Sequence, residues 1–174
     1  MKRILNIGSG EDIYGTDRID GVKRKNVTKV VNISNGLPYP DNTFDEVYSK
    51  NLFEHLENPQ LFLMECKRVL KKGGKIKIIT DNAGWVFFHH NPSGWVHGNY
   101  SYDDKFRKED MHFALYTKEH LRNHFIKAGL KINKQEYMFM DYPRTYWKFY
   151  VQLTIRILLG KRMGMPRLYI EGEK

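Results

Sequence analysis

The sequence is nearly free of cysteine and has no long apolar segment. Cys66 is the only cysteine among 174 residues, which excludes an internal disulfide and makes a cytoplasmic location the simplest expectation. No run of about 18 apolar residues occurs, so we expect no membrane-spanning helix. The opening residues MKRILNIGSG have no apolar stretch before their glycines, so we expect no secretory signal peptide.

Acidic residues are scarce relative to basic ones. The chain has 29 Lys and Arg against 20 Asp and Glu, a formal net charge of +9, and most of the excess lies in residues 101–174. A basic surface is typical of proteins that meet nucleic acid, acidic glycans or membrane headgroups. It is equally common in small proteins without such partners, so both interpretations stay open. The length fits a single domain over residues 1–174.

What the sequence does contain is a regular alternation of strand and helix patterns. This alternation predicts an α/β protein with a largely parallel sheet. The first helix is expected to begin after an Asn58 cap, with Pro59 in its first turn, and to stop at Gly73. We expect strands at residues 3–7, 28–33, 44–48, 75–79, 131–138 and 167–172, and helices at residues 58–73, 117–129 and 145–159.

The first strand runs into a glycine turn, Gly8-Ser9-Gly10. In α/β sheets, ligands bind outside the carboxyl ends of the strands, so this turn is the first candidate for a binding site. Its glycines allow the backbone to approach a ligand closely. Ile13 stands where the dinucleotide pattern G-x-G-x-x-G has its third glycine, which argues against an NAD enzyme.

An acid at the end of the second strand normally binds a ribose in such folds, and two acids are candidates. After Gly10 the chain must descend one strand length and climb again, which takes about five residues for each leg at ~3.3 Å per residue. The spacing is just long enough to reach Asp20 and too short to reach Asp17. We therefore prefer Asp20 as the ribose ligand and keep Asp17 as the fallback.

Three blocks of sequence carry a resemblance to a known family. ILNIGSG, GLPYPDNTFDEVYSKNLFEHL and ECKRVLKKGGKIKIITDN, in this order and spacing, resemble class I S-adenosylmethionine-dependent methyltransferases of the type-11 (UbiE-like) branch. Residues 115–132 are similar to a later helix and strand of that family. The resemblance implies a Rossmann-like fold with a mostly parallel seven-stranded sheet flanked by helices. It also implies S-adenosyl-L-methionine as the cofactor and methyl transfer as the activity.

The resemblance assigns cofactor roles to residues at matching positions. The glycine turn would lie under the methionine and ribose parts, and Asp20 would bind the ribose hydroxyls. Asn32 and Ile33 would hold the adenine, while Lys50 and Asn51 would border the methionine. The expected cofactor-binding residues are Asn6, Gly8, Ser9, Gly10, Asp20, Asn32, Ile33, Lys50 and Asn51.

The glycine turn departs from the family pattern in two ways. Asn6 stands where the family usually has an acid that helps to hold the methionine amine, and Ser9 replaces the usual cysteine. Both changes are expected to weaken cofactor binding. The helix that usually follows the turn is missing or reduced to a loop, as in a similar subgroup often associated with cell-surface polysaccharide genes.

Candidate catalytic residues follow the strand at residues 44–48. The ordinary pKa of a histidine suits it to accept a proton from an acceptor hydroxyl or amine, so His55, next to Glu54, is the candidate base. The alternative is that His55 only packs beside the pocket. Some relatives bind a divalent metal here through E-x-x-E-H, but Asn51 replaces the first carboxylate, so no metal is expected. Four further histidines match no standard zinc spacing: His89, His90, His97 and His112.

Two segments in the second half of the chain suggest acceptor or partner contacts. Residues 81–116 lack periodicity but are rich in aromatic residues, so we expect a lid and wall of the substrate pocket, or else a loop over the sheet edge. The helix at residues 145–159 is apolar over more of its circumference than packing on one sheet face needs. A dimer contact or a shallow contact with a membrane surface would use that excess.

Three functions are compatible with these features. The leading hypothesis is a methyltransferase that acts on a small molecule or on a sugar- or lipid-linked intermediate. The second is an RNA or protein methyltransferase, which the basic charge favours. The third is a catalytically inactive binding module, suggested by Asn6, by the shortened turn, and by Asn32 at a position where the family commonly has an Asp.

Overall fold

The computed structural model describes residues 1–85, 112–139 and 146–174. Within these ranges the chain forms strands, α-helices and two short 3-10 helices, which are named η1 and η2. In chain order the elements are β1 (Ile4–Ile7), β2 (Asp17–Asp20), β3 (Lys29–Val30), η1 (Ile33–Asn35), β4 (Phe44–Lys50), η2 (Phe53–His55), α1 (Pro59–Val69), β5 (Leu70–Asp81), α2 (Lys118–Lys127), β6 (Lys131–Met138), α3 (Tyr146–Gly164) and β7 (Arg167–Glu173).

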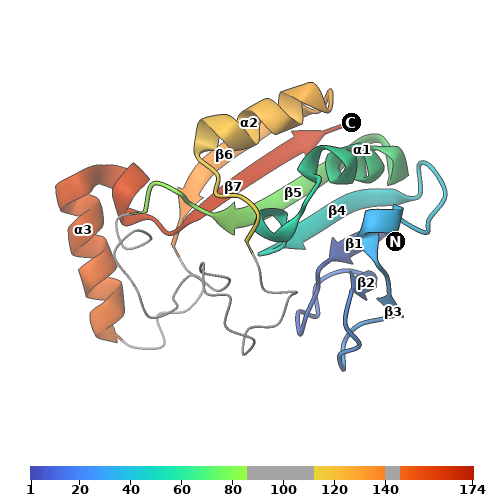
Figure 1. The fold of residues 1–174 in the computed structure, drawn as a ribbon, viewed down its shortest axis with the longest axis horizontal. Coiled ribbons are helices and arrows are strands. Elements are labelled where there is room, and N and C mark those ends of the chain that lie inside the picture. The colour runs from blue at the N-terminus through green and yellow to red at the C-terminus, as the bar shows by residue number, and fades with distance from the viewer. Residues whose placement is uncertain (86–111, 140–145) are drawn as a thin grey trace.

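The strands form one seven-stranded sheet with the order β3-β2-β1-β4-β5-β7-β6 (Figure 1). The first five strands pair in parallel, whereas β7 pairs antiparallel with both β5 and β6. The predicted α/β fold with a mostly parallel seven-stranded sheet is therefore confirmed. The direction in which the chain adds strands reverses beside β1, which has β2 on one side and β4 on the other.

One face of the sheet carries the apolar core. Alternate residues of the central strands point to this face, and the side chains of Leu5, Val47 and Ile78 are fully buried. Figure 1 shows α1 and α2 on the same side of the sheet. Leu63 of α1 and Phe125 of α2 are also fully buried within this core. Burial of this apolar face is the main force that holds the two helices on the sheet.

The opposite face of the sheet is polar. Lys77 donates to the Glu46 carboxylate across β4 and β5 at 3.0 Å, and Lys75 donates to Glu171 across β5 and β7 at 3.0 Å. Tyr169 also donates to Glu171, at 3.0 Å. A sheet with one apolar and one polar face explains why the KIKII segment of β5 alternates instead of being continuously apolar.

The two helix starts that were predicted from a capping residue are both confirmed. The Asn58 side chain accepts a hydrogen bond from Leu61 N at 3.0 Å, and Pro59 is the first residue of α1. Thr117 caps α2 in the same way by accepting from His120 N at 3.3 Å. These hydrogen bonds satisfy amide groups that have no partner within the helix itself.

The predicted helix end at Gly73 is wrong. α1 ends at Val69, and Leu70 is already extended and pairs with Phe44 of β4. Leu70 and Phe44 are both fully buried, so this long-range contact overrides the local stop signal at Gly73. The residues that were expected to form the last helical turn belong to β5 instead.

The third strand and the last helix have other bounds than predicted, whereas the segment after the glycine turn agrees with the prediction. Of the strand predicted at residues 28–33, only Lys29 and Val30 form β3, and the chain then turns into η1, where the Asn32 side chain accepts from Ser34 N. The last helix continues past Leu159 as far as Gly164, with a break at Gly160. The segment of residues 8–16 contains no helix, as expected from the departure of the glycine turn from the family pattern.

Within the described ranges, no helix combines the length and the apolar character that crossing a membrane requires. α3 nevertheless exposes apolar side chains, since Ile157 and Leu158 are each 73% exposed. The side chains of residues 146–149, 151 and 152 lie outside the described part of the structure.

Candidate cofactor cavity

A cavity of about 670 Å³ opens where the strand order reverses. Ligands bind at this place in doubly wound α/β sheets, and the volume lies in the range of roughly 300–1,000 Å³ that is typical of small-molecule sites. The loops that follow β1, β2, β3 and β4 all contribute to its wall. The lining residues are Gly8, Asp20, Gly21, Val22, Val31, Asn32, Ile33, Ser34, Leu52, His55, Leu56, Glu57, Asn58, Leu61 and Phe62.

The glycine turn brings bare backbone to the cavity. Gly8 has a positive φ of 68°, and a Cβ atom added there would lie 3.1 Å from the side chain of Leu52. The amides of Gly8 and Ser9 both donate to Ile19 O, at 2.9 and 3.0 Å. These bonds fix the turn against β2, and a side chain at Gly8 would be both strained and crowded.

Asp20 is the acid that reaches the cavity. Its two carboxylate oxygens accept from Gly10 N at 2.8 Å and from Val22 N at 2.9 Å. A carboxylate has about four acceptor positions, so two remain for ligand hydroxyls. Asp17 lies at the start of β2 and pairs with Arg3 at 2.9 Å, away from the residues that line the cavity. The geometry therefore favours Asp20 over Asp17.

Asn32 and Ile33 also line the cavity, at the end of the third strand's loop. The Asn32 amide oxygen already accepts from Ser34 N at 3.0 Å. An amide oxygen has two lone pairs, so this capping bond leaves one of them for a ligand.

The remaining predicted cofactor residues do not line this cavity. Asn6 is buried and donates to Tyr14 O at 3.1 Å, which supports the shortened turn from below. Asn51, at the end of β4, accepts from the guanidinium of Arg167. Ser9, Gly10 and Lys50 are likewise absent from the cavity wall. The cofactor roles of these five residues stay predictions.

The shortened turn is held to the sheet by a buried carboxylate. Tyr14 Oη donates to Glu46 Oε1 at 2.5 Å, and Lys2 donates to Glu46 Oε2 at 2.6 Å. Burial alone would raise the pKa of Glu46, but the hydrogen bonds from Lys2, Tyr14 and Lys77 hold that pKa below its ordinary value. Glu46 thus replaces, as an anchor, the helix that this turn lacks.

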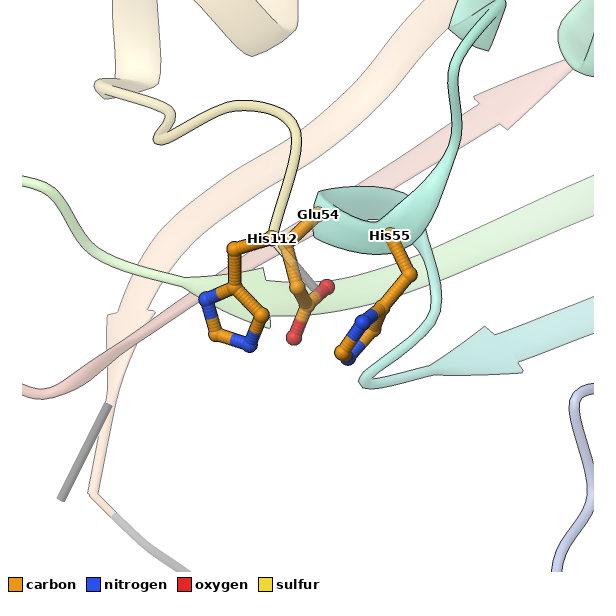
Figure 2. Close-up of side chains that lie close together, drawn as sticks. All are labelled: Glu54, His55 and His112. Carbon is orange, nitrogen blue, oxygen red and sulfur yellow. The ribbon is translucent and has the colours of Figure 1, made fainter. Parts of the chain in front are cut away.

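Glu54 and His55 lie in η2, directly after β4 (Figure 2). His55 lines the cavity, whereas Glu54 is only 1% exposed and accepts from Thr80 Oγ1 at 2.7 Å. Burial raises the pKa of Glu54, and the negative charge of Asp81 raises it further. The role of His55 as a proton acceptor stays a prediction.

Sequence reasoning missed two groups of residues at this edge. The apolar side chains of Leu52, Leu56 and Leu61 line the cavity. Leu52 and Leu56 lie in the block NLFEHL and Leu61 lies in α1, so their apolar character was visible in the sequence. His112 lies close to Glu54 and His55, although it is far from them in the sequence.

The predicted lid is described only at its two ends. Residues 81–85 and 112–116 have described positions, with Asn82 bridged to Tyr116 and Trp85 buried. Residues 86–111 lie outside the described part of the chain, so the expectation that they cover the substrate pocket stays a prediction. His89, His90 and His97 also lie outside the described part of the chain.

Comparison with known proteins connects this geometry with a family. Residues 5–78 match the type-11 model that describes a methyltransferase domain. The chain is 28% identical over 128 residues to a demethylmenaquinone methyltransferase of Shouchella clausii, an alignment that covers 67% of this chain and 54% of that protein. The chain spans about half the length, or less, of the curated relatives that it matches.

Solved structures show the same fold at low sequence identity. A SAM-dependent methyltransferase of Thermotoga maritima, a possible histamine N-methyltransferase, superposes with a TM-score of 0.68 at 16% identity over 100% of this chain and 83% of that chain. A putative methyltransferase in complex with the Trm112 methyltransferase activator of Haloferax volcanii superposes with a TM-score of 0.65 at 16% identity. That alignment covers 99% of this chain and 82% of that chain.

Proposed function

Since residues 5–78 belong to the type-11 branch of the class I methyltransferases, we propose that this chain binds S-adenosyl-L-methionine in the cavity beside Gly8 and transfers its methyl group to an acceptor. The observation that carries the proposal is the position of Asp20. Its carboxylate is fixed by two backbone amides at the cavity wall and keeps acceptor positions for the ribose hydroxyls. We also propose a cytoplasmic location, as expected from the single cysteine.

In this proposal, each part of the cofactor contacts residues at the end of a different strand. Gly8 and Asp20 would hold the ribose, and Asn32 and Ile33 would hold the adenine. The methionine part then lies toward the end of β4. Residues proposed to border that part are Asn6, Ser9, Gly10, Lys50 and Asn51.

Methyl transfer needs little chemistry from the protein itself. Bound S-adenosylmethionine would supply the methyl group: an acceptor atom would donate an electron pair to the methyl carbon, the bond from that carbon to sulfur would break, and the product S-adenosylhomocysteine would be a neutral thioether. A proton on the acceptor passes to solvent or to a nearby base. The main contribution of the chain is to hold the two reactants in line. Such positioning lowers the activation barrier by up to about 7–11 kcal/mol.

We propose a small molecule or a sugar- or lipid-linked intermediate as the acceptor. Leu52, Leu56 and Leu61 give the cavity wall an apolar part, which suits a partly apolar molecule. The demethylmenaquinone methyltransferase of Shouchella clausii is a relative whose name specifies a partly apolar substrate. The net charge of +9 favours RNA or an acidic protein as a second candidate, and the complex with Trm112 shows that a structural neighbour has a protein partner.

Calorimetric titration with S-adenosylmethionine and S-adenosylhomocysteine tests the proposal. We expect low-micromolar binding to the wild type and at least about tenfold weaker binding to Asp20→Ala, because hydrogen bonds to a charged group contribute ~1.5–3 kcal/mol. Asp17→Ala is the matched control, since this acid pairs with Arg3 outside the cavity. Thermal unfolding of each variant shows whether it is folded.

The other outcomes separate the alternative functions. A folded wild type that binds neither compound would refute the proposal and leave the inactive binding module suggested by Asn6 and Asn32. Weaker binding in Asp17→Ala but not in Asp20→Ala would reverse the assignment of the ribose ligand. Tight binding of RNA that weakens steeply with salt would favour the nucleic-acid methyltransferase.

A further inference from the structure

Three side chains of the types that bind transition metals meet beside the cofactor cavity. Glu54, His55 and His112 each offer one ligand atom, and these atoms all lie within 4.8 Å of one another. Figure 2 shows the Glu54 carboxylate between the two imidazole rings. Glu54 and His55 come from η2, whereas His112 comes from the segment that leads to Tyr116.

The backbone holds the two segments together. Phe113 N donates to the Glu54 carbonyl oxygen at 2.9 Å, and Ala114 N approaches the same oxygen at 3.4 Å. His112 therefore sits beside η2 because its neighbours are hydrogen-bonded to Glu54, and not through a chance side-chain contact. His55 is fixed in turn by the bond from its amide to Leu52 O at 2.9 Å.

The ligand atoms have supporting contacts as well. Thr80 Oγ1 donates to Glu54 Oε2 at 2.7 Å, which orients the carboxylate and leaves Oε1 as the ligand atom. Hydrogen bonds of this kind orient metal ligands in many proteins. The rings of His55 and His112 lie 4.5 Å apart at 89°, an edge-to-face arrangement rather than a stack.

The spacing fits a small cation. Zinc binds histidine nitrogen and carboxylate oxygen at about 2.0–2.2 Å, so tetrahedral ligand atoms lie ~3.3–3.5 Å apart. The three ligand atoms lie within 4.8 Å of one another, so side-chain rotations that move them by about 1 Å bring them to that separation. Two imidazoles and one carboxylate favour a transition metal, because calcium and magnesium prefer oxygen ligands throughout.

The local charge favours a cation too. Glu54 is buried, and it takes no part in the ion pairs formed among the described residues. The nearby Arg167 pairs with Asp81 at 3.1 Å. A buried carboxylate is costly unless a positive charge compensates it, and a bound dication supplies that charge.

We propose that Glu54, His55 and His112 bind one divalent transition metal ion of the zinc class. From the sequence we expected no metal, because Asn51 replaces the first carboxylate of the E-x-x-E-H pattern. His112 supplies the third ligand from a distant segment. A three-residue site leaves a coordination position open for water or for an acceptor oxygen, and this last consequence rests on the proposed function. A metal on His55 would also replace its expected role as a base.

Zinc titration of the full chain against a chromogenic chelator tests the site. We expect one tight site in the wild type and affinity reduced at least tenfold in His112→Ala. His120→Ala is the matched control, because His120 is exposed on α2 and lies outside the cluster. Equal zinc affinity in His112→Ala and the wild type would overturn the proposal, as would an equal loss in His120→Ala.

Cobalt substitution gives a second readout that identifies the ligands. Visible absorption typical of four-coordinate Co²⁺ is expected in the wild type and should be lost in Glu54→Gln, which keeps an acceptor for Thr80 but removes the charge. Absorption that is unchanged in this variant would contradict the site. Titration of the same variants with S-adenosylhomocysteine in the absence of metal reports on the cofactor cavity separately, so the two proposals can fail independently.

Discussion

At the scale of single residues, Glu46 illustrates how the molecule compensates for a missing element. The shortened turn has no helix to pack on the sheet, and Tyr14 instead donates to a carboxylate that is fully buried. Lys2 and Lys77 supply the positive charge that makes burial of this carboxylate tolerable. Removal of the Glu46 carboxylate should therefore destabilise the turn as a whole.

Glu46→Gln should lower the free energy of unfolding at pH 7 by ~1–3 kcal/mol, because hydrogen bonds to a charged group are lost. The folded pKa of Glu46 lies below its ordinary value of 4.5, so its contribution is complete above that value and disappears as the pH falls through the folded pKa. The difference between wild type and variant should then shrink in acid. Urea unfolding at several pH values measures it.

Glu136→Gln is the control for this experiment. Glu136 pairs with Lys134 on the same strand, and its side chain is 42% exposed, so its removal should have little effect. If Glu46→Gln were no less stable than Glu136→Gln at pH 7, the anchoring role of Glu46 would be wrong.

At the scale of elements, the guanidinium of Arg68 in α1 binds several groups of the loop at residues 37–41. It donates to Leu37 O at 2.9 Å and Tyr39 O at 2.8 Å, and it pairs with Asp41 at 2.8 Å. Glu65 completes the arrangement by accepting from Leu37 N at 2.8 Å. Helix α1 thus holds the loop of residues 37–41 and fixes the entry into β4.

Arg68→Lys should destabilise the protein by ~1–3 kcal/mol, although the charge is kept. A lysine ammonium cannot reach the two carbonyls and the carboxylates that the planar guanidinium binds together. Urea unfolding gives the change in stability, and hydrogen exchange at Leu37 N reports the loosened loop. Arg122→Lys, on the exposed face of α2, is the matched control. Equal stability of the two variants would show that Arg68 does not hold the loop.

The starts of α1 and α2 were predictable from sequence, but the end of α1 depended on a distant contact. The cap of Asn58 and the first-turn Pro59 are local signals, and they located the start of α1 correctly. The end of α1 depends on the pairing of Leu70 with Phe44, which no local pattern reveals. Likewise, a simple estimate of chain reach placed Asp20 at the end of β2, whereas the partnership of His112 with Glu54 requires the folded chain.

At the scale of the whole molecule, the candidate site is built from the ends of neighbouring parallel strands. Loops after β1, β2, β3 and β4 meet at the same edge of the sheet, and each contributes to one cavity. The alternation of β5 predicted a strand, but the family resemblance was needed to predict a sheet of seven strands.

The central claim is that this cavity binds S-adenosylmethionine with Asp20 on the ribose. A crystal structure of the full chain with S-adenosylhomocysteine tests it most directly. We predict that the ribose hydroxyls donate to the Asp20 carboxylate, with the adenine beside Ile33. A ligand bound outside this cavity, or a ribose without contact to Asp20, would contradict the account.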